Sequence, residues 1–385
     1  MEIQKLKDIC LTEITDGTHQ TPTYSEYGYI FLSSKNVTTQ KIDWDNVMFI
    51  PEKLHEELYK RVAPQIDDIL LAKNGTTGVA AIVDRDIVFD IYVSLALIRP
   101  NTEIVMPRYL LYAINNPVVK GYFDSSLKGI GVPNLHLKNI RETPIKIYDL
   151  ETQKAIVEKL DKVCELISLR KQQLEKLDEL VKARFVEMFG ESEYPCNSLI
   201  SLIIEGAGLS YGIVQPGDDG TGDMGVLRPV DFADGKIKTD SIKYIDRSLG
   251  NGFKKTELNG NELLITVRGT TGITALTDSR FKGMNVTRGI AVIRYDKKKV
   301  DPIYLNEYIK MEKSQQYIKE HTRGATLQQI NLSELRDLEI VIPPLPLQRV
   351  FATFVERVDQ QKQTVQQSLE KLELMKKALM QEFFW

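Results

Sequence analysis

The residues best suited to chemistry in this chain lie in two short glycine-containing turns of nearly the same sequence. The first reads Lys73-Asn74-Gly75-Thr76-Thr77-Gly78 and the second reads Val267-Arg268-Gly269-Thr270-Thr271-Gly272. Glycines let backbone N–H groups approach an anion closely, and threonine hydroxyls hydrogen-bond to phosphate oxygens. Lysine, asparagine and arginine side chains can reach the edges of nucleic-acid bases. A structural β-turn is the alternative, but the recurrence of the turn favours contact with a ligand.

A second pair of matching segments lies further along the chain, at 128–136 and 323–331. Each opens with a cation and a glycine, Lys128-Gly129 and Arg323-Gly324, and then carries amide side chains. Asparagine and glutamine pair with adenine, and arginine and lysine pair with guanine, so these residue types are the usual readers of base edges. A polar loop that caps the following segment is the alternative. The sequence therefore predicts a second nucleic-acid contact in each copy.

No catalytic arrangement accompanies these turns. The four histidines, His19, His55, His136 and His321, have neither metal-ligand spacing nor paired cysteines or carboxylates. The sequence contains no GxxxxGK[ST] phosphate-binding loop and no GxGxxG after a strand, and it lacks the Asn/Asp-Pro-Pro-aromatic tetrad of adenine methyltransferases. We therefore expect a chain that binds and is not itself an enzyme.

Composition narrows the class of protein further. The 385 residues carry a net charge of −3, and no segment has the basic excess usual for a protein that binds DNA mainly through phosphates. Three scattered cysteines form no disulfide framework, and neither a signal peptide nor an apolar run long enough for a membrane is evident. We expect a cytoplasmic protein with no membrane partner, whose phosphate contacts are locally sorted or supplied by other subunits.

The elements that position these motifs occur twice. Besides the turns, Leu174-Glu175-Lys176-Leu177 returns unchanged as Leu369-Glu370-Lys371-Leu372, 195 positions later. A period of this length indicates a duplicated domain with its connector. Short β-rich runs punctuated by glycine, proline and asparagine predict mixed α/β domains at 1–150, which we call head 1, and at 191–345, which we call head 2.

The segments 151–190 and 346–385 are different in kind. From 156 to 188, and again from 351 to 383, positions spaced alternately by four and three residues are apolar at eight of ten places. This heptad spacing is the signature of a coiled coil. A helix of about 38 residues spans roughly 55 Å, longer than either head, so two helices packed separately on their heads are the less favoured alternative. We expect an α+β fold with an internal pseudo-two-fold repeat, in which a long antiparallel two-helix coiled coil separates the heads.

Taken together, these features resemble the specificity (S) subunit of type I restriction–modification systems over essentially the whole length. The resemblance rests on the duplicated order of domain and helix, on the two Gly-Thr-Thr-Gly turns, and on three further motifs. These are Asp16-Gly17-Thr18-His19 with Thr21-Pro22, Phe31-Leu32-Ser33-Ser34-Lys35-Asn36-Val37, and Pro343-Pro344-Leu345-Pro346-Leu347-Gln348.

The resemblance implies that each head is a target-recognition domain that reads one half of a bipartite, asymmetric DNA sequence, with the coiled coil setting the spacer. It also implies partners: double-stranded DNA, two methyltransferase subunits that carry S-adenosylmethionine, and restriction subunits that use ATP and magnesium. No cofactor or metal is expected on this chain. The residues expected to contact DNA are Lys35, Asn36, Lys73, Asn74, Gly75, Thr76, Thr77, Lys128, Asn134, His136, Arg228, Arg268, Gly269, Thr270, Thr271, Arg323, Gln328, Gln329 and Asn331.

The two heads differ in sequence where they are expected to read DNA. Asp16-Gly17-Thr18-His19 has no clear counterpart in head 2, and Leu227-Arg228-Pro229-Val230 replaces Leu32-Ser33-Ser34-Lys35. We therefore expect the two half-sites to differ. A DNA-binding component of another modification system and a two-headed protein scaffold remain as alternative functions.

Overall fold

The computed structural model describes residues 1–127, 134–190, 193–214, 217, 222–233, 235–325 and 327–384. The chain divides into two compact units, each described here by itself. One unit comprises Met1–Lys171 with Gln367–Trp385, and the other comprises Gln172–Gln366. Each unit therefore contains one head, one half of the first long helix and one half of the second.

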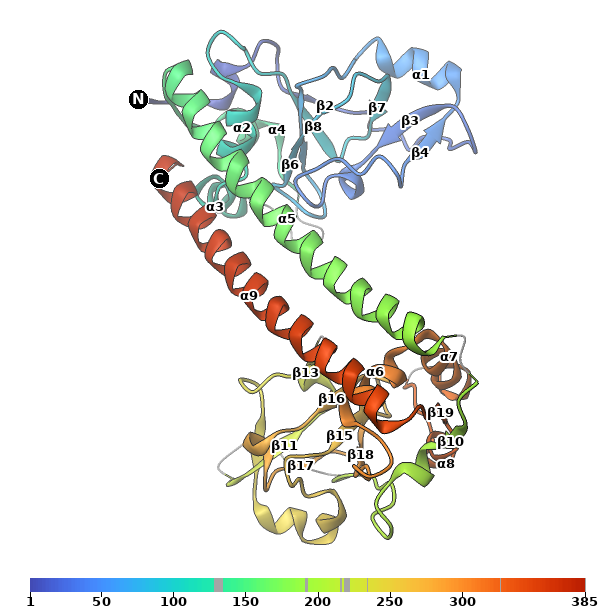
Figure 1. The fold of residues 1–385 in the computed structure, drawn as a ribbon. Coiled ribbons are helices and arrows are strands. Elements are labelled where there is room, and N and C mark those ends of the chain that lie inside the picture. Colours follow the sequence, from blue (N-terminus) through green and yellow to red (C-terminus); the bar gives the residue numbers. More distant parts are fainter. Residues whose placement is uncertain are drawn as a thin grey trace. The chain divides into compact units, whose positions relative to one another are not determined.

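Head 1 is built on a four-stranded antiparallel sheet in the order β2-β8-β5-β6 (Figure 1). A second sheet, β4-β3-β7, contains one parallel pair, and β1 pairs with β9. The elements are β1 (Glu2–Lys5), β2 (Thr15–Asp16), β3 (Tyr29–Leu32), β4 (Met48–Ile50), α1 (Glu52–Tyr59), β5 (Ile69–Ala72), β6 (Ala80–Ile82), β7 (Phe89–Ile91), β8 (Leu95–Ile98), α2 (Pro107–Ile114), α3 (Pro117–Ser126), α4 (Leu137–Arg141) and β9 (Pro144–Ile147).

Head 2 repeats this plan with a three-stranded sheet, β16-β15-β18, and a second sheet, β14-β11-β17, that again contains one parallel pair. The pairs β10-β19 and β12-β13 complete it. The elements are β10 (Cys196–Ser198), β11 (Met224–Leu227), β12 (Phe232–Ala233), β13 (Lys236–Ile237), β14 (Lys243–Ile245), β15 (Leu263–Thr266), β16 (Thr274–Leu276), β17 (Asn285–Val286), β18 (Ile290–Ile293), α6 (Pro302–Lys310), α7 (Glu312–His321), α8 (Leu332–Arg336) and β19 (Glu339–Val341).

The strand that precedes each glycine turn is buried on both faces. In β5, Ile69 and Leu71 enter the core under α2 and α3, whereas Leu70 and Ala72 enter the core under the second sheet. Strand β15 divides its side chains in the same way between two cores. A strand covered on both faces reads as a continuous apolar run. The turns thus follow a strand that is buried on both faces in each head.

The duplication is visible in individual hydrogen bonds. The Tyr109 hydroxyl donates to the Lys146 carbonyl at 2.6 Å, and the Tyr304 hydroxyl, 195 positions later, donates to the Val341 carbonyl at 2.7 Å. Burial raises the pKa of both tyrosines, so both remain neutral donors. Two fully buried glutamines, Gln153 and Gln348, also match. Gln153 accepts from the Met106 N–H just before α2, and Gln348 accepts from the Asp301 N–H just before α6.

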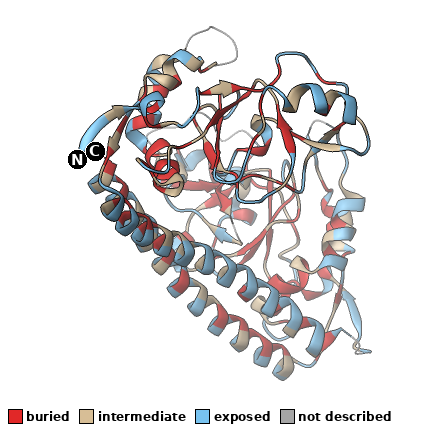
Figure 2. Ribbon diagram, turned by 90° about the horizontal axis from the view of Figure 1, so that it is seen from above, coloured by how far each residue is buried: buried red, intermediate tan, exposed pale blue. Residues whose placement is uncertain are grey.

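The long helices are α5 (Leu150–Phe189) and α9 (Leu345–Phe384). All twenty heptad positions predicted from the sequence are buried or half-buried, and exposed residues lie between them (Figure 2). In the first unit Ile156 and Leu160 of α5 share a core with Phe384 of α9, and in the second unit Val181 of α5 shares a core with Phe351 of α9. The helices therefore fit the predicted coiled coil. Within the described residues, no helix is both long and apolar enough to cross a membrane.

Candidate nucleic-acid interface

In head 1 the glycine turn and the loop that precedes α4 form one surface. Asn74 and Asn134 make an isolated antiparallel bridge, and the Leu135 N–H donates to the Lys73 carbonyl at 2.9 Å. Gly75 and Gly78 both have positive φ, +75° and +83°, so the tight turn requires glycine there. The two segments singled out separately from the sequence are therefore joined through the backbone.

Head 2 joins the equivalent segments in the same way. Arg268 bridges to Gln329, the Gly269 N–H donates to the Gln328 carbonyl at 2.8 Å, and the Ile330 N–H donates to the Val267 carbonyl at 3.0 Å. Arg268 thus occupies the position of Asn74, and Gln329 that of Asn134. The backbone of the surface is shared by the two heads, whereas its side chains differ.

Most of the predicted contact residues present polar groups at or near this surface. Thr76 and Thr270 are exposed at the tips of their turns. Lys35 is exposed in a short 3-10 helix. Ser94 links this helix to the glycine turn, because its hydroxyl accepts from the Ser34 N–H and its carbonyl accepts from the Lys73 N–H. The other exposed members are Gly75, His136, Gly269, Arg323, Gln328 and Asn331, and the half-buried ones are Asn74, Thr77, Asn134, Arg268, Thr271 and Gln329. Lys128 lies outside the described residues.

Three of the predicted residues are instead engaged in holding the fold. Lys73 is buried and its Nζ lies 2.5 Å from the Asp16 carboxylate. Asn36 is buried and its amide donates to two backbone carbonyls. The guanidinium of Arg228 pairs at 2.9 Å with Asp231, whose carboxylate is fully buried. Because these side chains already have buried partners, we leave all three out of the proposed interface.

Two other predicted residues also have partners at the second loop of head 2. Asn331 and Glu334 form a capping box at the start of α8, which matches the alternative of a capping loop. Arg323 is exposed and its Nη2 lies 2.9 Å from Glu334. By contrast, Arg268 makes no ion pair with any residue that the structure describes. Of the three predicted cations of head 2, Arg228, Arg268 and Arg323, Arg268 alone has no ion pair among the described residues.

The segment Asp16-Gly17-Thr18-His19 has a structural counterpart in head 2, although its sequence is not repeated there. Asp16 pairs with Ala96 in head 1, and Tyr211 pairs with Ala291 in head 2, with 195 positions between the members of each match. The glycines that follow, Gly17 and Gly212, both lie so close to a neighbouring carbonyl oxygen that a Cβ would be 1.9 Å from it. Register and the close approach of the backbone identify the counterpart, although only the glycine is retained in sequence.

Two functional candidates escaped the sequence analysis because they converge on Asp16 only in the folded chain. The His19 Nε2 lies 3.2 Å from Asp16 Oδ1, and the Arg61 Nη2 lies 3.4 Å from the same oxygen. Burial raises the pKa of Asp16, but the hydrogen bond and charge of Lys73, followed by those of His19, more than offset this and leave the pKa lowered. Asp16 is therefore an ionised carboxylate shared by three basic side chains. The histidine was visible in a motif, whereas no local signal marks Arg61.

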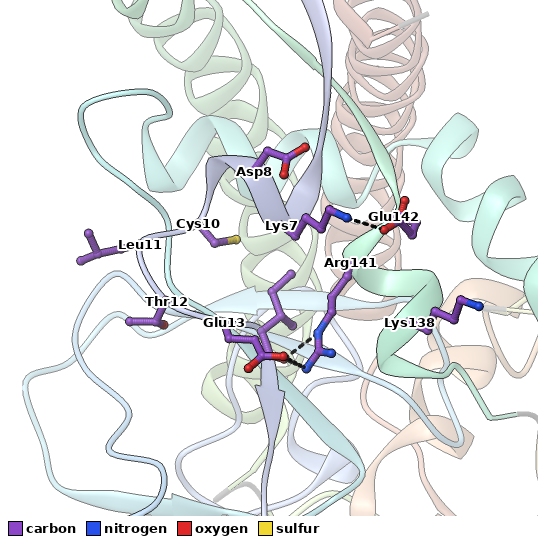
Figure 3. A pocket seen from close by; sticks show the side chains of 10 residues that line it. Lys7, Asp8, Cys10, Leu11, Thr12, Glu13, Lys138, Arg141 and Glu142 are labelled. Atoms are coloured by element: carbon purple, nitrogen blue, oxygen red, sulfur yellow. Dashed lines mark hydrogen bonds and ion pairs between the residues drawn. The ribbon is translucent and has the colours of Figure 1, made fainter.

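A cavity of about 610 Å³ lies at the other end of β2 and is lined by charged residues (Figure 3). Glu142 accepts from Lys5 and Lys7, which lower its pKa to about 2. Arg141 pairs with Glu13 at 2.8 Å and also donates to the carbonyl of Ile14, the residue before β2, at 2.7 Å. Its counterpart Arg336 donates to the Leu209 carbonyl at 3.3 Å. The paired charges thus fasten the strand that carries Asp16.

Neither a metal-binding group nor a reactive thiol is evident among the described residues of these surfaces. Among the described residues, no group of three or more His, Cys, Asp or Glu is placed to hold a metal ion. Burial raises the pKa of the Cys10 thiol in the cavity to about 12, which suppresses its nucleophilic thiolate form. The recurring arrangement in both heads is a buried strand followed by a polar, glycine-containing surface.

Comparison with known proteins identifies the family. The family model for the type I restriction modification DNA specificity domain matches residues 1–179 and 221–374. The chain belongs to this family. It is a DNA sequence-specificity subunit of the type I restriction–modification class, as the resemblance in the sequence had indicated.

Relatives agree with this assignment, and solved structures agree with the fold. The putative type I restriction enzyme MjaX specificity subunit of Methanocaldococcus jannaschii is 25% identical, covering 98% of this chain and 91% of the relative. The EcoBI specificity subunit of Escherichia coli is 20% identical, covering 65% of this chain and 58% of the relative. A chain from a structural study of type I R-M complex assembly and conformational transition is 18% identical, covers 100% and 97% of the two chains, and has a TM-score of 0.59. The S subunit from M. genitalium is 12% identical, covers 100% and 96%, and also has a TM-score of 0.59. These structural likenesses concern the fold.

Proposed function

We propose that each head of this specificity subunit reads one half of a bipartite, asymmetric DNA target. The observation that carries this proposal is the surface common to both heads, in which one backbone arrangement presents different side chains. Asn74 faces Asn134 in head 1, whereas Arg268 faces Gln329 in head 2. One framework carrying two sets of polar side chains is what an asymmetric target requires.

The chemistry of these side chains indicates what each head can distinguish. Asparagine and glutamine bond to the N6 and N7 edge of adenine, and arginine bonds to O6 and N7 of guanine. The buried amide oxygens of Asn74 and Asn134 have no hydrogen-bond partner within the described structure. Buried polar atoms ordinarily have a partner, so these oxygens are candidates for a donor supplied by a bound base or by water. Head 2 adds the cation of Arg268, so a guanine contact is expected in its half-site.

Phosphate contacts should position the heads without carrying sequence information. The hydroxyls of Thr76 and Thr270, exposed at the tips of the two glycine turns, are suited to this role. The net charge of −3 is low for a protein that holds DNA mainly through phosphates. We therefore infer that partner subunits supply much of the electrostatic affinity.

We further infer that α5 and α9 pair in antiparallel fashion and set the length of the unspecified spacer. The contacts inside each unit support this pairing. The start of α5 meets the end of α9 in the first unit, where Lys159 lies over the Phe383 ring, and the end of α5 meets the start of α9 in the second unit, where Phe185 packs on Phe351. Ion pairs between Lys171 and Glu373 and between Asp178 and Lys362 continue the seam.

The chain is proposed to act without catalytic groups of its own, as one subunit of a larger complex. Two methyltransferase subunits would carry S-adenosylmethionine and the methylation chemistry, one for each half of the internal repeat. Restriction subunits would use ATP and magnesium. A subunit that directs other subunits to DNA needs only binding surfaces, which agrees with the motifs that the sequence contains.

The proposal is tested by selecting binding sites from a randomised duplex library with the specificity subunit assembled with its methyltransferase subunits. The expected result is two short conserved blocks separated by a fixed number of unspecified bases. The Arg268→Ala variant should alter one block and leave the other intact. A single block, or no enrichment over the starting library, would contradict a bipartite reader.

A further inference from the structure

The cluster around Asp16 is the feature of head 1 that the common framework does not explain. The Asp16 side chain is 4% exposed and Lys73 alone, at 7% exposed, neutralises it. Two further basic side chains nevertheless reach the same carboxylate, and both remain open to solvent: His19 is 67% exposed and Arg61 is 49% exposed. A single buried carboxylate does not need three basic partners for its own stability.

The cluster adjoins the interface described above. Lys73 immediately precedes Asn74 of the glycine turn, and its carbonyl accepts from the loop that precedes α4. Arg61 also donates to the Gly17 carbonyl at 3.2 Å, so one edge of its guanidinium is fixed by two acceptors. The remaining donors of this half-exposed guanidinium make no hydrogen bond among the described residues. Asp16 thus holds an excess of positive charge at the edge of the proposed DNA surface.

Head 2 shows that the fold can do without the cluster. By strand register, Tyr211 stands in place of Asp16 and Val267 stands in place of Lys73, and Val214 follows where head 1 has His19. The three central strands, the glycine turn and the loop of head 1 all have counterparts in head 2, which form around this uncharged substitute. A charge cluster present in one of two copies of one framework is therefore best explained by what head 1 binds.

We propose that Arg61 is a specificity-determining residue of head 1, and that Asp16 is the positioning residue that holds it against a guanine of its half-site. This inference rests on the proposed function and deepens it. Guanine presents two acceptors, N7 and O6, in the major groove, and a guanidinium fixed along one edge can still donate from the other. In head 2, Tyr211 and Val267 stand in place of Asp16 and Lys73, so the second half-site cannot be read in this way.

The first experiment compares variants of the assembled complex by selection from a randomised duplex library. Arg61→Ala should relax one guanine position in the head 1 half-site by about 5- to 150-fold, the range for loss of a good base contact. Lys60→Ala is the matched control, because Lys60 is an exposed cation next to Arg61 and does not contact Asp16. A uniform loss of affinity for all sequences would assign Arg61 to a phosphate and overturn the inference.

The role of Asp16 needs a variant that keeps the fold. Asp16→Asn alone leaves the buried Lys73 without its counter-charge, so it can fail through instability. The double variant Asp16→Asn with Lys73→Met removes both buried charges and approaches the apolar arrangement of head 2. It should melt near the wild type and still lose discrimination at the head 1 half-site. If it keeps both stability and discrimination, Asp16 has only a structural role and the positioning proposal is wrong.

Arg268→Ala, measured in parallel, tests the bipartite function separately from the role of Arg61. If Arg268→Ala changes one half-site and Arg61→Ala changes nothing, the bipartite function stands and this inference fails. If neither variant changes either half-site while the selection still yields two blocks, this inference and the role given to Arg268 both fail but bipartite reading stands. The proposed function fails only if the wild-type complex selects a single block or none.

Discussion

Arg268 and Arg228 belong to the same head, yet the structure predicts opposite effects when each is replaced by alanine. Arg268 is half-buried in the glycine turn and has no ion pair among the described residues. Arg228 donates through its side chain to Asp231 at 2.9 and 3.2 Å and to the Ser241 carbonyl at 2.6 Å. Arg228→Ala should therefore destabilise head 2, whereas Arg268→Ala should impair reading.

The size of each effect follows from burial. Removing one partner of a buried ion pair costs about 3–5 kcal/mol. Arg228 is 23% exposed, and Asp231 keeps a backbone N–H and the Ser241 hydroxyl as donors, so the lower end applies. About 3 kcal/mol corresponds to a fall of roughly 6–12 °C in the melting temperature of a unit of this size. Arg268→Ala should change stability by less than about 0.5 kcal/mol but reduce discrimination at one base by about 1–3 kcal/mol.

Calorimetry on the assembled complex and competition binding with single-base variants of the selected target measure the two effects separately. Binding is measured well below the melting transition, so that Arg228→Ala is compared as a folded protein. If Arg268→Ala lowers the melting temperature as much as Arg228→Ala does, the division between a structural Arg228 and a DNA-reading Arg268 is refuted. It is equally refuted if Arg228→Ala relaxes a base position while the transition stays in place.

Three further predictions concern the rest of the molecule. Inserting four residues into both long helices, after Lys171 and after Gln366, adds about 6 Å to each helix. The unspecified spacer should then lengthen by one or two base pairs, at roughly 3.4 Å each. If methylome sequencing finds the original spacer at full activity, the helices do not set its length. Phe384→Ala should lower the free energy of unfolding by about 3–5 kcal/mol, because Phe384 is buried with its ring 5.3 Å from that of Tyr109. Native mass spectrometry should still find the wild-type subunit stoichiometry. Loss of a partner subunit from a stably folded variant would instead give the C-terminal end of α9 a docking role. The purified chain alone should not methylate DNA or hydrolyse ATP, as radiolabelled assays can check, and methyl transfer that persists through further purification would contradict the assignment of catalysis to other subunits.

Patterns carried by neighbouring residues were enough to predict much of this protein. The heptad stripes predicted both long helices. Apolar residues that recur every three or four positions lie on one face of an α-helix, and that face is stable when it packs on a partner. The repeat at 195 positions predicted two matching domains, and the glycine turns follow buried strands in both. The family resemblance drew on the same local patterns, and the comparison with known proteins confirmed it.

Tertiary structure decided which polar side chains remain available for binding, and no local pattern could have done so. Lys73 belongs to a turn that looks ready to bind an anion, but Asp16, 57 positions away in sequence, neutralises it inside the head. Arg228 is fixed by a buried carboxylate in a similar way, and Arg61 reaches Asp16 from the far end of a helix. Residue type alone does not determine whether a charge reads DNA or holds the fold, because burial and the nearest counter-charge depend on segments brought together only by folding.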